Sequence, residues 1–211
     1  MNIKQALQLY FIMGSQNTSA NPVIVLEQAI EGGITCFQYR EKGSGSKTGE
    51  ERLQLGQSLR DLCKVNNIPF IVNDDIELGL VLDADGIHIG QDDIPVKEVK
   101  KLIPSHMIVG ISTSTIEEST QAMNDGADYI GVGPIYATQS KEDAIAPIHE
   151  SGLQHIREAL PSMPIVAISG IDESNARRVI EAGADGISLI SAISQAEDVV
   201  KTTKELLEQL S

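Results

Sequence analysis

A repeated unit constrains the fold of this chain more than any other feature of the sequence. In each copy a helical pattern ends at Gly or another small residue, the chain turns, and a short apolar strand begins. The copies are residues 27–40, 80–91, 121–135 and 179–193. Asp85, Asp128 and Asp185 occupy equivalent turns in three of them. Internal repetition of this kind indicates that strands and helices alternate along the chain.

Eight short apolar segments are expected to form strands. They cover residues 9–13, 35–40, 69–73, 86–89, 107–112, 129–133, 164–168 and 186–190. Helical patterns alternate with them over residues 22–32, 48–66, 75–82, 95–103, 115–125, 151–160, 173–182 and 195–210. Strands that are apolar on both faces are typical of a parallel sheet covered by helices. The sequence therefore predicts a TIM (β/α)8 barrel over residues 1–211 as a single α/β domain. A flavodoxin-like open sheet is the alternative, but it leaves several strands without a place.

Composition limits the classes of partner. The formal net charge is -14 and the pI is about 4.6, which argues against nucleic acid, because binding the phosphate backbone needs a basic face. Apolar runs are shorter than the roughly 20 residues of a membrane helix, and the N-terminus does not resemble a secretion signal. We therefore expect a cytoplasmic protein that acts on small molecules and can form a homo-oligomer. Cys36 and Cys63 are expected to be inert core thiols.

Polar and basic residues recur at every second position where the second strand ends. Side chains alternate between the two sides of a strand, so Gln38, Arg40 and Lys42 are expected to point the same way. In a barrel of this type the active site lies at the carboxyl ends of the strands. Guanidinium and ammonium groups at that position are suited to phosphate oxygens.

Carboxylates follow the third and fourth strands. Neighbouring parallel strands lie about 4.8 Å apart, so their ends can bring Asn73, Asp74 and Asp93 together. Two carboxylates completed by water and phosphate oxygens are typical of Mg²⁺ sites. Asp75 and Asp92 are instead expected to cap, or to complement in charge, the helices that follow.

Other strand ends carry weaker signals. His88 is expected to be a hydrogen-bonded histidine inside the barrel, and Ser112 to lie at the tip of the fifth strand. The loop after the sixth strand supplies hydroxyl groups and a cation, at Thr138, Ser140 and Lys141. After the last two strands come Gly170, Ile190 and Ser191, where this fold commonly binds phosphate. One side of the mouth thus fits a diphosphate with a metal and the other a monophosphate, which favours a coupling reaction with diphosphate as the leaving group.

The sequence resembles the thiamine-phosphate synthase family over essentially its whole length. The matching stretches are QYREK, TGEER, FIVNDDIELGL, ADGIHIGQDD, GADYIGVGPIYAT, SK and EAGADGISLISAI. The resemblance implies the joining of 4-amino-2-methyl-5-hydroxymethylpyrimidine diphosphate to hydroxyethylthiazole phosphate. The products are thiamine phosphate and pyrophosphate, and the pyrophosphate leaves before the thiazole nitrogen attacks.

The resemblance also implies roles for individual residues. The residues implied to hold the pyrimidine diphosphate are Gln38, Tyr39, Arg40, Glu41, Lys42, Asn73, Ser112 and Lys141. Those implied to hold the thiazole phosphate are Thr138, Gln139, Ser140, Gly170, Ile190 and Ser191. Asp74 and Asp93 are implied to bind Mg²⁺, and Arg40, Lys42, Ser112 and Lys141 to take part in catalysis. The chain departs from the family pattern at Ser169, where a second glycine is usual, and at Ser114, where a histidine is common.

Three other functions stay open at this point. A related barrel, the thiazole tautomerase, isomerises the thiazole and joins nothing, but the complete set of diphosphate-binding residues argues against it. A non-catalytic sensor of thiamine-pathway phosphates would need largely the same binding residues. A phosphoribosyl isomerase would need an acid–base pair that the sequence does not place.

Overall fold

The fold is a closed barrel of eight parallel strands in a computed structural model that describes residues 2–137 and 146–210. Each strand pairs with the next along the chain, and β8 closes the barrel against β1. The strands are β1 (Leu9–Met13), β2 (Cys36–Tyr39), β3 (Phe70–Asn73), β4 (Gly86–Ile89), β5 (Ile108–Thr113), β6 (Tyr129–Val132), β7 (Ile165–Ile168) and β8 (Gly186–Leu189). The predicted (β/α)8 barrel is therefore confirmed, with every strand boundary within one residue of its expected position.

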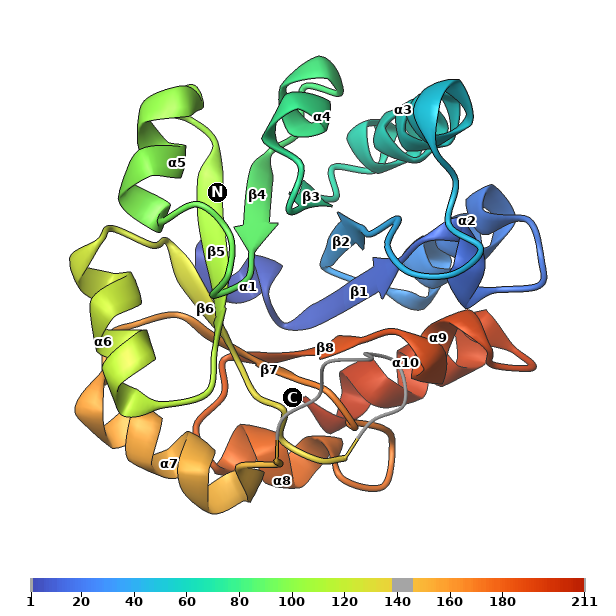
Figure 1. The fold of residues 1–211 in the computed structure, drawn as a ribbon. Helices are drawn as coiled ribbons and strands as arrows, with labels where there is room; N and C mark the ends of the chain where they lie inside the picture. Colours follow the sequence, from blue (N-terminus) through green and yellow to red (C-terminus); the bar gives the residue numbers. More distant parts are fainter. Residues whose placement is uncertain (1, 138–145, 211) are drawn as a thin grey trace.

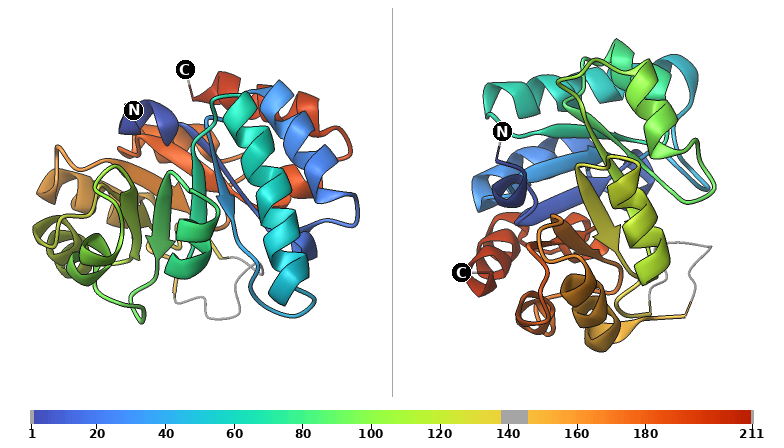
Figure 2. Two further views of the ribbon diagram at one scale, coloured as in Figure 1. Left: turned by 90° about the horizontal axis from the view of Figure 1, so that it is seen from above. Right: turned by 90° about the vertical axis from the view of Figure 1, so that its left-hand side faces the viewer.

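Helices lie around the outside of the barrel, except for α1, which lies at its amino end (Figures 1 and 2). They are α1 (Ile3–Ala6), η1 (Ser15–Asn17), α2 (Pro22–Gly32), α3 (Gly49–Val65), α4 (Ile76–Val81), α5 (Val96–Leu102), α6 (Ile116–Asn124), α7 (His149–Ala159), α8 (Ala176–Glu181), α9 (Ser191–Ser194) and α10 (Val199–Gln209). The last helix begins later than expected, because the Asp198 side chain caps it by accepting a hydrogen bond from the Lys201 N–H. In the described part of the chain, every helix is too short or too polar to cross a membrane.

The buried residues form two separate layers. The larger layer lies between the strands and the helices and contains Phe11, Phe37 and Phe70, whose rings pack in series. The smaller layer fills the barrel interior and includes Tyr10 and Tyr129. Successive residues of each strand alternate between the layers, as the pleat of a strand requires. Both cysteines are buried, as predicted, and burial raises the pKa of the Cys63 thiol to about 12.

The three equivalent aspartates perform one structural task at the amino ends of the strands. The carboxylates of Asp85, Asp128 and Asp185 each accept a hydrogen bond from the first part of the preceding strand, from the N–H groups of Phe70, Val109 and Ile165 at 2.8, 2.7 and 2.9 Å. Each aspartate also pairs with a basic side chain, from Arg60, Lys100 and Arg157 respectively. The repeat seen in the sequence is therefore a structural tie between neighbouring strands.

This rim lies at the end of the barrel away from the mouth. Figure 2 shows α1 and the end of α10 together at that same end. Lys4 of α1 pairs with Asp185 at 2.8 Å and so ties the start of the chain to the rim. The amino ends of the strands thus carry structural contacts, and the functional site is expected at the carboxyl ends.

Candidate active site

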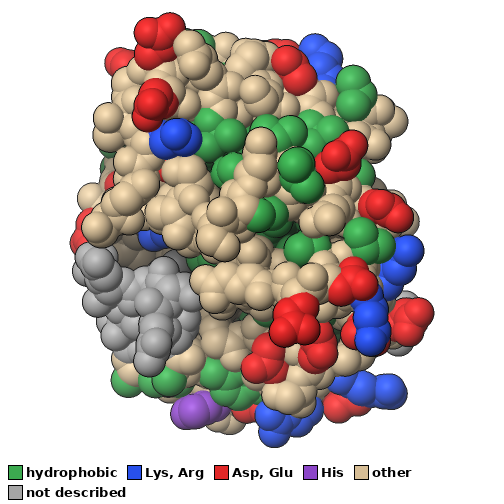
Figure 3. Space-filling model, turned by 90° about the vertical axis from the view of Figure 1, so that its right-hand side faces the viewer, with side chains coloured by type: hydrophobic (Ala, Val, Ile, Leu, Met, Phe, Trp, Pro, Cys, Tyr) green, Lys and Arg blue, Asp and Glu red, His purple; other side chains and the backbone are tan. Residues whose placement is uncertain are grey.

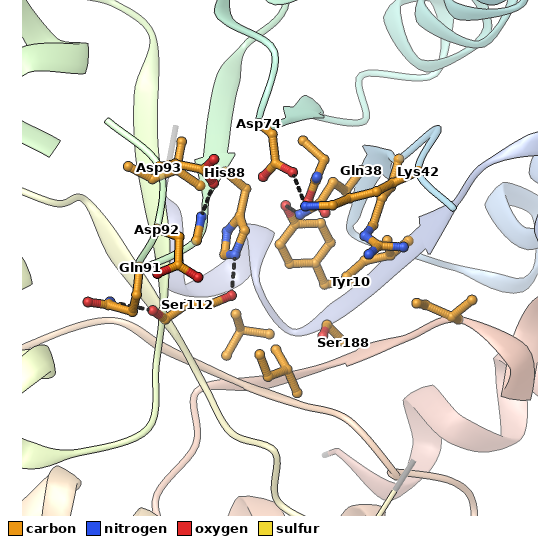
Figure 4. Close-up of a pocket in the computed structure, with 18 residues that line it drawn as sticks. Tyr10, Gln38, Lys42, Asp74, His88, Gln91, Asp92, Asp93, Ser112 and Ser188 are labelled. Carbon is orange, nitrogen blue, oxygen red and sulfur yellow. Dashed lines mark hydrogen bonds and ion pairs between the residues drawn. The ribbon is translucent and has the colours of Figure 1, made fainter. Parts of the chain in front are cut away.

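A cavity of about 280 Å³ opens at the carboxyl ends of the strands (Figure 4). Its lining residues come from seven of the eight strands or from the segments that follow them, with β6 as the exception. They are Tyr10, Ile12, Gln38, Arg40, Lys42, Asn73, Asp74, His88, Ile89, Gly90, Gln91, Asp92, Asp93, Ser112, Val166, Ile168, Ser188 and Ile190. Figure 3 views the molecule from the right-hand side of Figure 1 and shows a basic side chain inside a hollow of an otherwise mixed surface. The lining contains two basic side chains, Arg40 and Lys42, together with three carboxylates, Asp74, Asp92 and Asp93.

Strand β2 and the residues after it deliver Gln38, Arg40 and Lys42 to the cavity, as the period of two predicts. Gln16 fixes this segment, because its amide donates hydrogen bonds to the Arg40 and Lys42 carbonyl oxygens at 3.0 and 3.1 Å. Gly14 permits the approach, since a Cβ there would lie 2.1 Å from the Arg40 oxygen. Sequence reasoning missed Gln16 because its loop contains no recognisable motif.

The side chains of Tyr39 and Glu41 point away from the cavity. The Tyr39 hydroxyl is buried in the outer layer and donates to the Arg52 carbonyl at 2.9 Å. The Glu41 carboxylate accepts hydrogen bonds from the N–H and hydroxyl of Ser15 and from the N–H of Lys47. Glu41 thereby holds the loop after β2 against the loop after β1. Contact between substrate and Tyr39 or Glu41 stays a prediction, and it would have to involve their backbone groups.

The ends of β3 and β4 bring the predicted polar set together, because Asn73, Asp74 and Asp93 all line the cavity. Asp74 has a φ of +61°, a left-handed conformation that aspartate and asparagine adopt more readily than most residues. Its carboxylate accepts a hydrogen bond from the Lys42 ammonium at 2.7 Å. The Asp93 carboxylate accepts from the Gly90 N–H at 2.7 Å. Two carboxylates and the Lys42 ammonium thus line the same cavity.

The two neighbouring aspartates differ from each other. Asp75 is the N-cap of α4, as predicted: it accepts from the Leu78 N–H at 2.9 Å and from Arg52 at 2.8 Å. The prediction that Asp92 caps the next helix is wrong. Helix α5 begins at Val96 with Pro95 as its N-cap, and Asp92 lines the cavity. Three residues separate Asp92 from the first residue of the helix, so its side chain lies at the cavity and not at the helix end.

The donor set at this position suits a hard cation, because carboxylate and amide oxygens are the ligands Mg²⁺ prefers. Within residues 2–137 and 146–210, His, Cys, Asp and Glu side chains do not form a group of three or more arranged to hold a metal ion. Two carboxylates can still suffice when water and ligand oxygens complete the coordination, as is usual for Mg²⁺. The residues present therefore fit an ion that arrives with a phosphorylated ligand.

His88 and Ser112 meet in the barrel interior. The His88 Nε2 lies 3.0 Å from the Ser112 hydroxyl oxygen, and the Nδ1 lies 3.0 Å from the Tyr129 hydroxyl oxygen. His88 is 7% exposed, so the prediction of a hydrogen-bonded interior histidine is confirmed. The Gln91 amide donates to the Ser112 carbonyl oxygen at 2.7 Å and holds the backbone of β5 at the mouth.

The residues expected at the other side of the mouth are only partly on the cavity. Ile190 lines it, whereas Gly170 and Ser191 do not. Ser169 and Gly170 both have left-handed backbones, with φ of +73° and +70°. The family pattern of two glycines is thus understandable, because glycine adopts this conformation without strain. Thr138, Gln139, Ser140 and Lys141 lie outside the described residues.

Known proteins resemble this chain over nearly its full length. The family model described as thiamine monophosphate synthase matches residues 9–193. A thiamine-phosphate synthase of Bacillus cereus (strain AH820) is 52% identical over 209 residues, which cover 99% of this chain and 95% of that protein. One of Bacillus velezensis is 52% identical over 208 residues, covering 99% and 92%. The solved thiamine phosphate pyrophosphorylase from Pyrococcus furiosus superimposes with a TM-score of 0.88 at 35% identity, covering 99% of this chain and 98% of that one.

Proposed function

This chain belongs to the thiamine monophosphate synthase family, and on that premise we propose that it is a transferase that forms thiamine phosphate. The substrates are 4-amino-2-methyl-5-hydroxymethylpyrimidine diphosphate and hydroxyethylthiazole phosphate, and the second product is pyrophosphate. One observation carries the proposal. Cationic, amide, hydroxyl and carboxylate groups from β2 to β5 converge on a single cavity of about 280 Å³.

The basic groups are assigned to the leaving diphosphate. Arg40 and Lys42 follow the same strand and line the same cavity, where they can neutralise negative charge as the C–O bond to the diphosphate breaks. We assign the same role to Lys141 on the basis of the sequence. Asn73 and Ser112 supply neutral polar groups that orient the substrate. Expulsion of a diphosphate followed by attack of the thiazole nitrogen needs no strong base, and it suits a site built of cations and amides.

Magnesium is proposed at the carboxylates of Asp74 and Asp93. These two carboxylates would hold the ion, which would add positive charge at the leaving group. The Lys42 ammonium donates to one oxygen of Asp74. We propose that ligand binding separates this pair, so that the ammonium faces phosphate while the carboxylate faces the cation.

The thiazole phosphate is assigned to the opposite side of the mouth. Ile190 lines the cavity there. The left-handed turn at Ser169 and Gly170 directly follows the last residue of β7, Ile168. Backbone N–H groups of such turns can bind an anion. Ser191, together with Thr138, Gln139 and Ser140, is proposed for the same subsite from the sequence.

A coupling assay tests the proposal. Purified protein is incubated with each substrate alone, with both, and with both plus EDTA, while thiamine phosphate and pyrophosphate are measured. We expect both products in equal amounts only when both substrates are present, and we expect chelation to stop the reaction. Pyrophosphate without thiamine phosphate, or isomerisation of the thiazole alone, would contradict the assignment. Full activity after thorough chelation would remove the metal from it.

A further inference from the structure

A chain of five hydrogen-bonded side chains crosses the barrel interior beneath the cavity. It runs from Gln38 through Tyr10, Tyr129 and His88 to Ser112, and its four contacts measure 2.9, 3.0, 3.0 and 3.0 Å. Four of the five residues line the cavity (Figure 4). Tyr129 is fully buried. The two end residues, Gln38 and Ser112, are the ones that the proposed function assigns to the pyrimidine substrate.

The contacts of the chain have a direction. The Gln38 amide donates to the Tyr10 hydroxyl, which carries one proton and passes it toward the Tyr129 oxygen. Tyr129 then donates to the Nδ1 of His88, which acts as an acceptor. The neutral ring therefore carries its proton on Nε2 and donates it to the Ser112 oxygen. Reversing one contact by itself would leave two protons in one contact or none in another, so the whole chain must reverse together.

The surroundings keep the chain intact. Burial raises the pKa of the Tyr10 and Tyr129 hydroxyls well above the ordinary value of tyrosine, so both retain their protons. The neighbouring thiol of Cys36 donates to the Pro69 carbonyl oxygen at 3.6 Å. Two strand glycines make the space: a Cβ at Gly110 would lie 2.0 Å from the Tyr129 ring, and one at Gly131 would lie 3.1 Å from His88.

We propose that Tyr10, Tyr129 and His88 form a directional relay that fixes the donor and acceptor roles of Gln38 and Ser112 toward the pyrimidine. In this direction Gln38 presents its carbonyl oxygen as an acceptor, and Ser112 keeps its own proton to donate. A 4-aminopyrimidine offers the complement, an amine that donates and ring nitrogens that accept. A 4-oxopyrimidine in its lactam form reverses both roles. The relay therefore makes the site select the amine over the oxo compound, and its three inner members are positioning residues.

This inference rests on the proposed function for the identity of the ligand, but its first test needs no ligand. Nitrogen-15 NMR of the full chain reports which ring nitrogen of a neutral histidine carries the proton, and a His88→Gln variant assigns the signal. We expect the Nε2–H form for His88. The Nδ1–H form would overturn the direction of the relay. The tautomer is read in the wild-type chain, and the variant serves only to assign the signal.

The second test measures selectivity without turnover. Calorimetry compares binding of the 4-aminopyrimidine diphosphate with that of its 4-oxo analogue, in the presence of Mg²⁺ and the absence of thiazole. We expect the wild type to prefer the amine about 100-fold, since a site built for hydrogen bonds strongly rejects a reversed pattern. Tyr129→Phe keeps Gln38 and Ser112 but breaks the relay, and it should lower that preference at least about tenfold. Tyr10→Phe should do the same.

Thr203→Val provides the matched control, because it removes a buried hydroxyl from α10, where Thr203 donates to the Val199 carbonyl at 2.7 Å. Its preference for the amine should equal that of the wild type. A folded Tyr129→Phe or Tyr10→Phe protein with the wild-type preference would overturn the relay. A wild-type chain that couples the substrates but binds both pyrimidines equally would also overturn it, while leaving the proposed function standing.

Discussion

Replacing Asp74 by asparagine distinguishes a role in catalysis from a role in stability, because the Asp74 carboxylate contributes little to the stability of the fold. Among the described residues its carboxylate pairs with Lys42 alone, and the side chains of Asp74 and Lys42 are 26% and 54% exposed. Exposed pairs of this kind contribute about 0.5 kcal/mol. Asparagine also tolerates the left-handed backbone of φ +61° at this position. We therefore expect the melting temperature of Asp74→Asn to fall by only about 1–2 °C.

The effect on turnover should be far larger. If Asp74 holds the cation that stabilises the leaving diphosphate, its loss removes an electrostatic contribution of about 2.7–4 kcal/mol, or 10²–10³ in kcat. Pyrophosphate release measured across a range of Mg²⁺ concentrations gives both the loss and any shift in the metal dependence. Turnover within about threefold of wild type at every Mg²⁺ concentration would refute the assignment.

The adjacent residue supplies the control. Asp75→Asn keeps a good N-cap on α4 but weakens the contact with Arg52, so it should cost about 1 kcal/mol of stability. Its turnover should stay within about threefold of wild type, since the side chain caps a helix instead of lining the cavity. Equal losses of turnover in the two variants would show that this segment responds to any change of charge, and the reasoning about Asp74 would then fail.

Three further predictions concern the rim, the barrel interior and the loop after β6. Asp185→Asn should lower the melting temperature by about 4–8 °C, because it weakens a charge-assisted hydrogen bond worth about 2 kcal/mol, whereas the exposed Glu181→Gln should change it little. Burial opposes ionisation of Asp185, but its hydrogen bonds and basic neighbours prevail and lower the pKa of the carboxyl group. The stability that Asp185 contributes should therefore be full above about pH 5 and should disappear as the pH falls through the folded-state pKa. Gly110→Ala should cost about 3 kcal/mol in a denaturant titration, and clearly more than Gly131→Ala, because its methyl group would overlap the Tyr129 ring. Lys141→Ala should reduce kcat by about 10²-fold or more with an unchanged melting temperature, and near-normal turnover would end the role assigned to this cation.

The sequence predicts the barrel well because one strand–helix unit repeats along the chain. Short apolar strands, small residues at helix ends and three equivalent aspartates repeat along the chain, and each repeat is a local pattern. The errors lie where tertiary contacts decide. Asp92 resembles a helix cap in sequence, but Pro95 begins the helix. Residues 173–175 and 195–198 resemble helix, but α8 begins at Ala176 and α10 begins only after the Asp198 cap.

The cavity is partly predictable for the same reason. Alternation along β2 places Gln38, Arg40 and Lys42 correctly, and applied strictly it also excludes the side chains of Tyr39 and Glu41. Ser188 has no such signal, because a serine within an apolar strand does not reveal which layer it faces. Gln91 has none either, since its position depends on how the loop after β4 folds back onto β5.

The relay was beyond sequence reasoning for a more basic reason. Tyr10 and Tyr129 are 119 residues apart on β1 and β6, strands that do not pair, and a tyrosine in an apolar strand resembles an ordinary core residue. Their hydroxyls meet only after all eight strands have closed in one register. A slip of one residue would move either tyrosine to the outer layer and leave Gln38 or His88 buried without its partner. The hydrogen bonds that orient the proposed substrate contacts therefore also disfavour every barrel in which those contacts would not form.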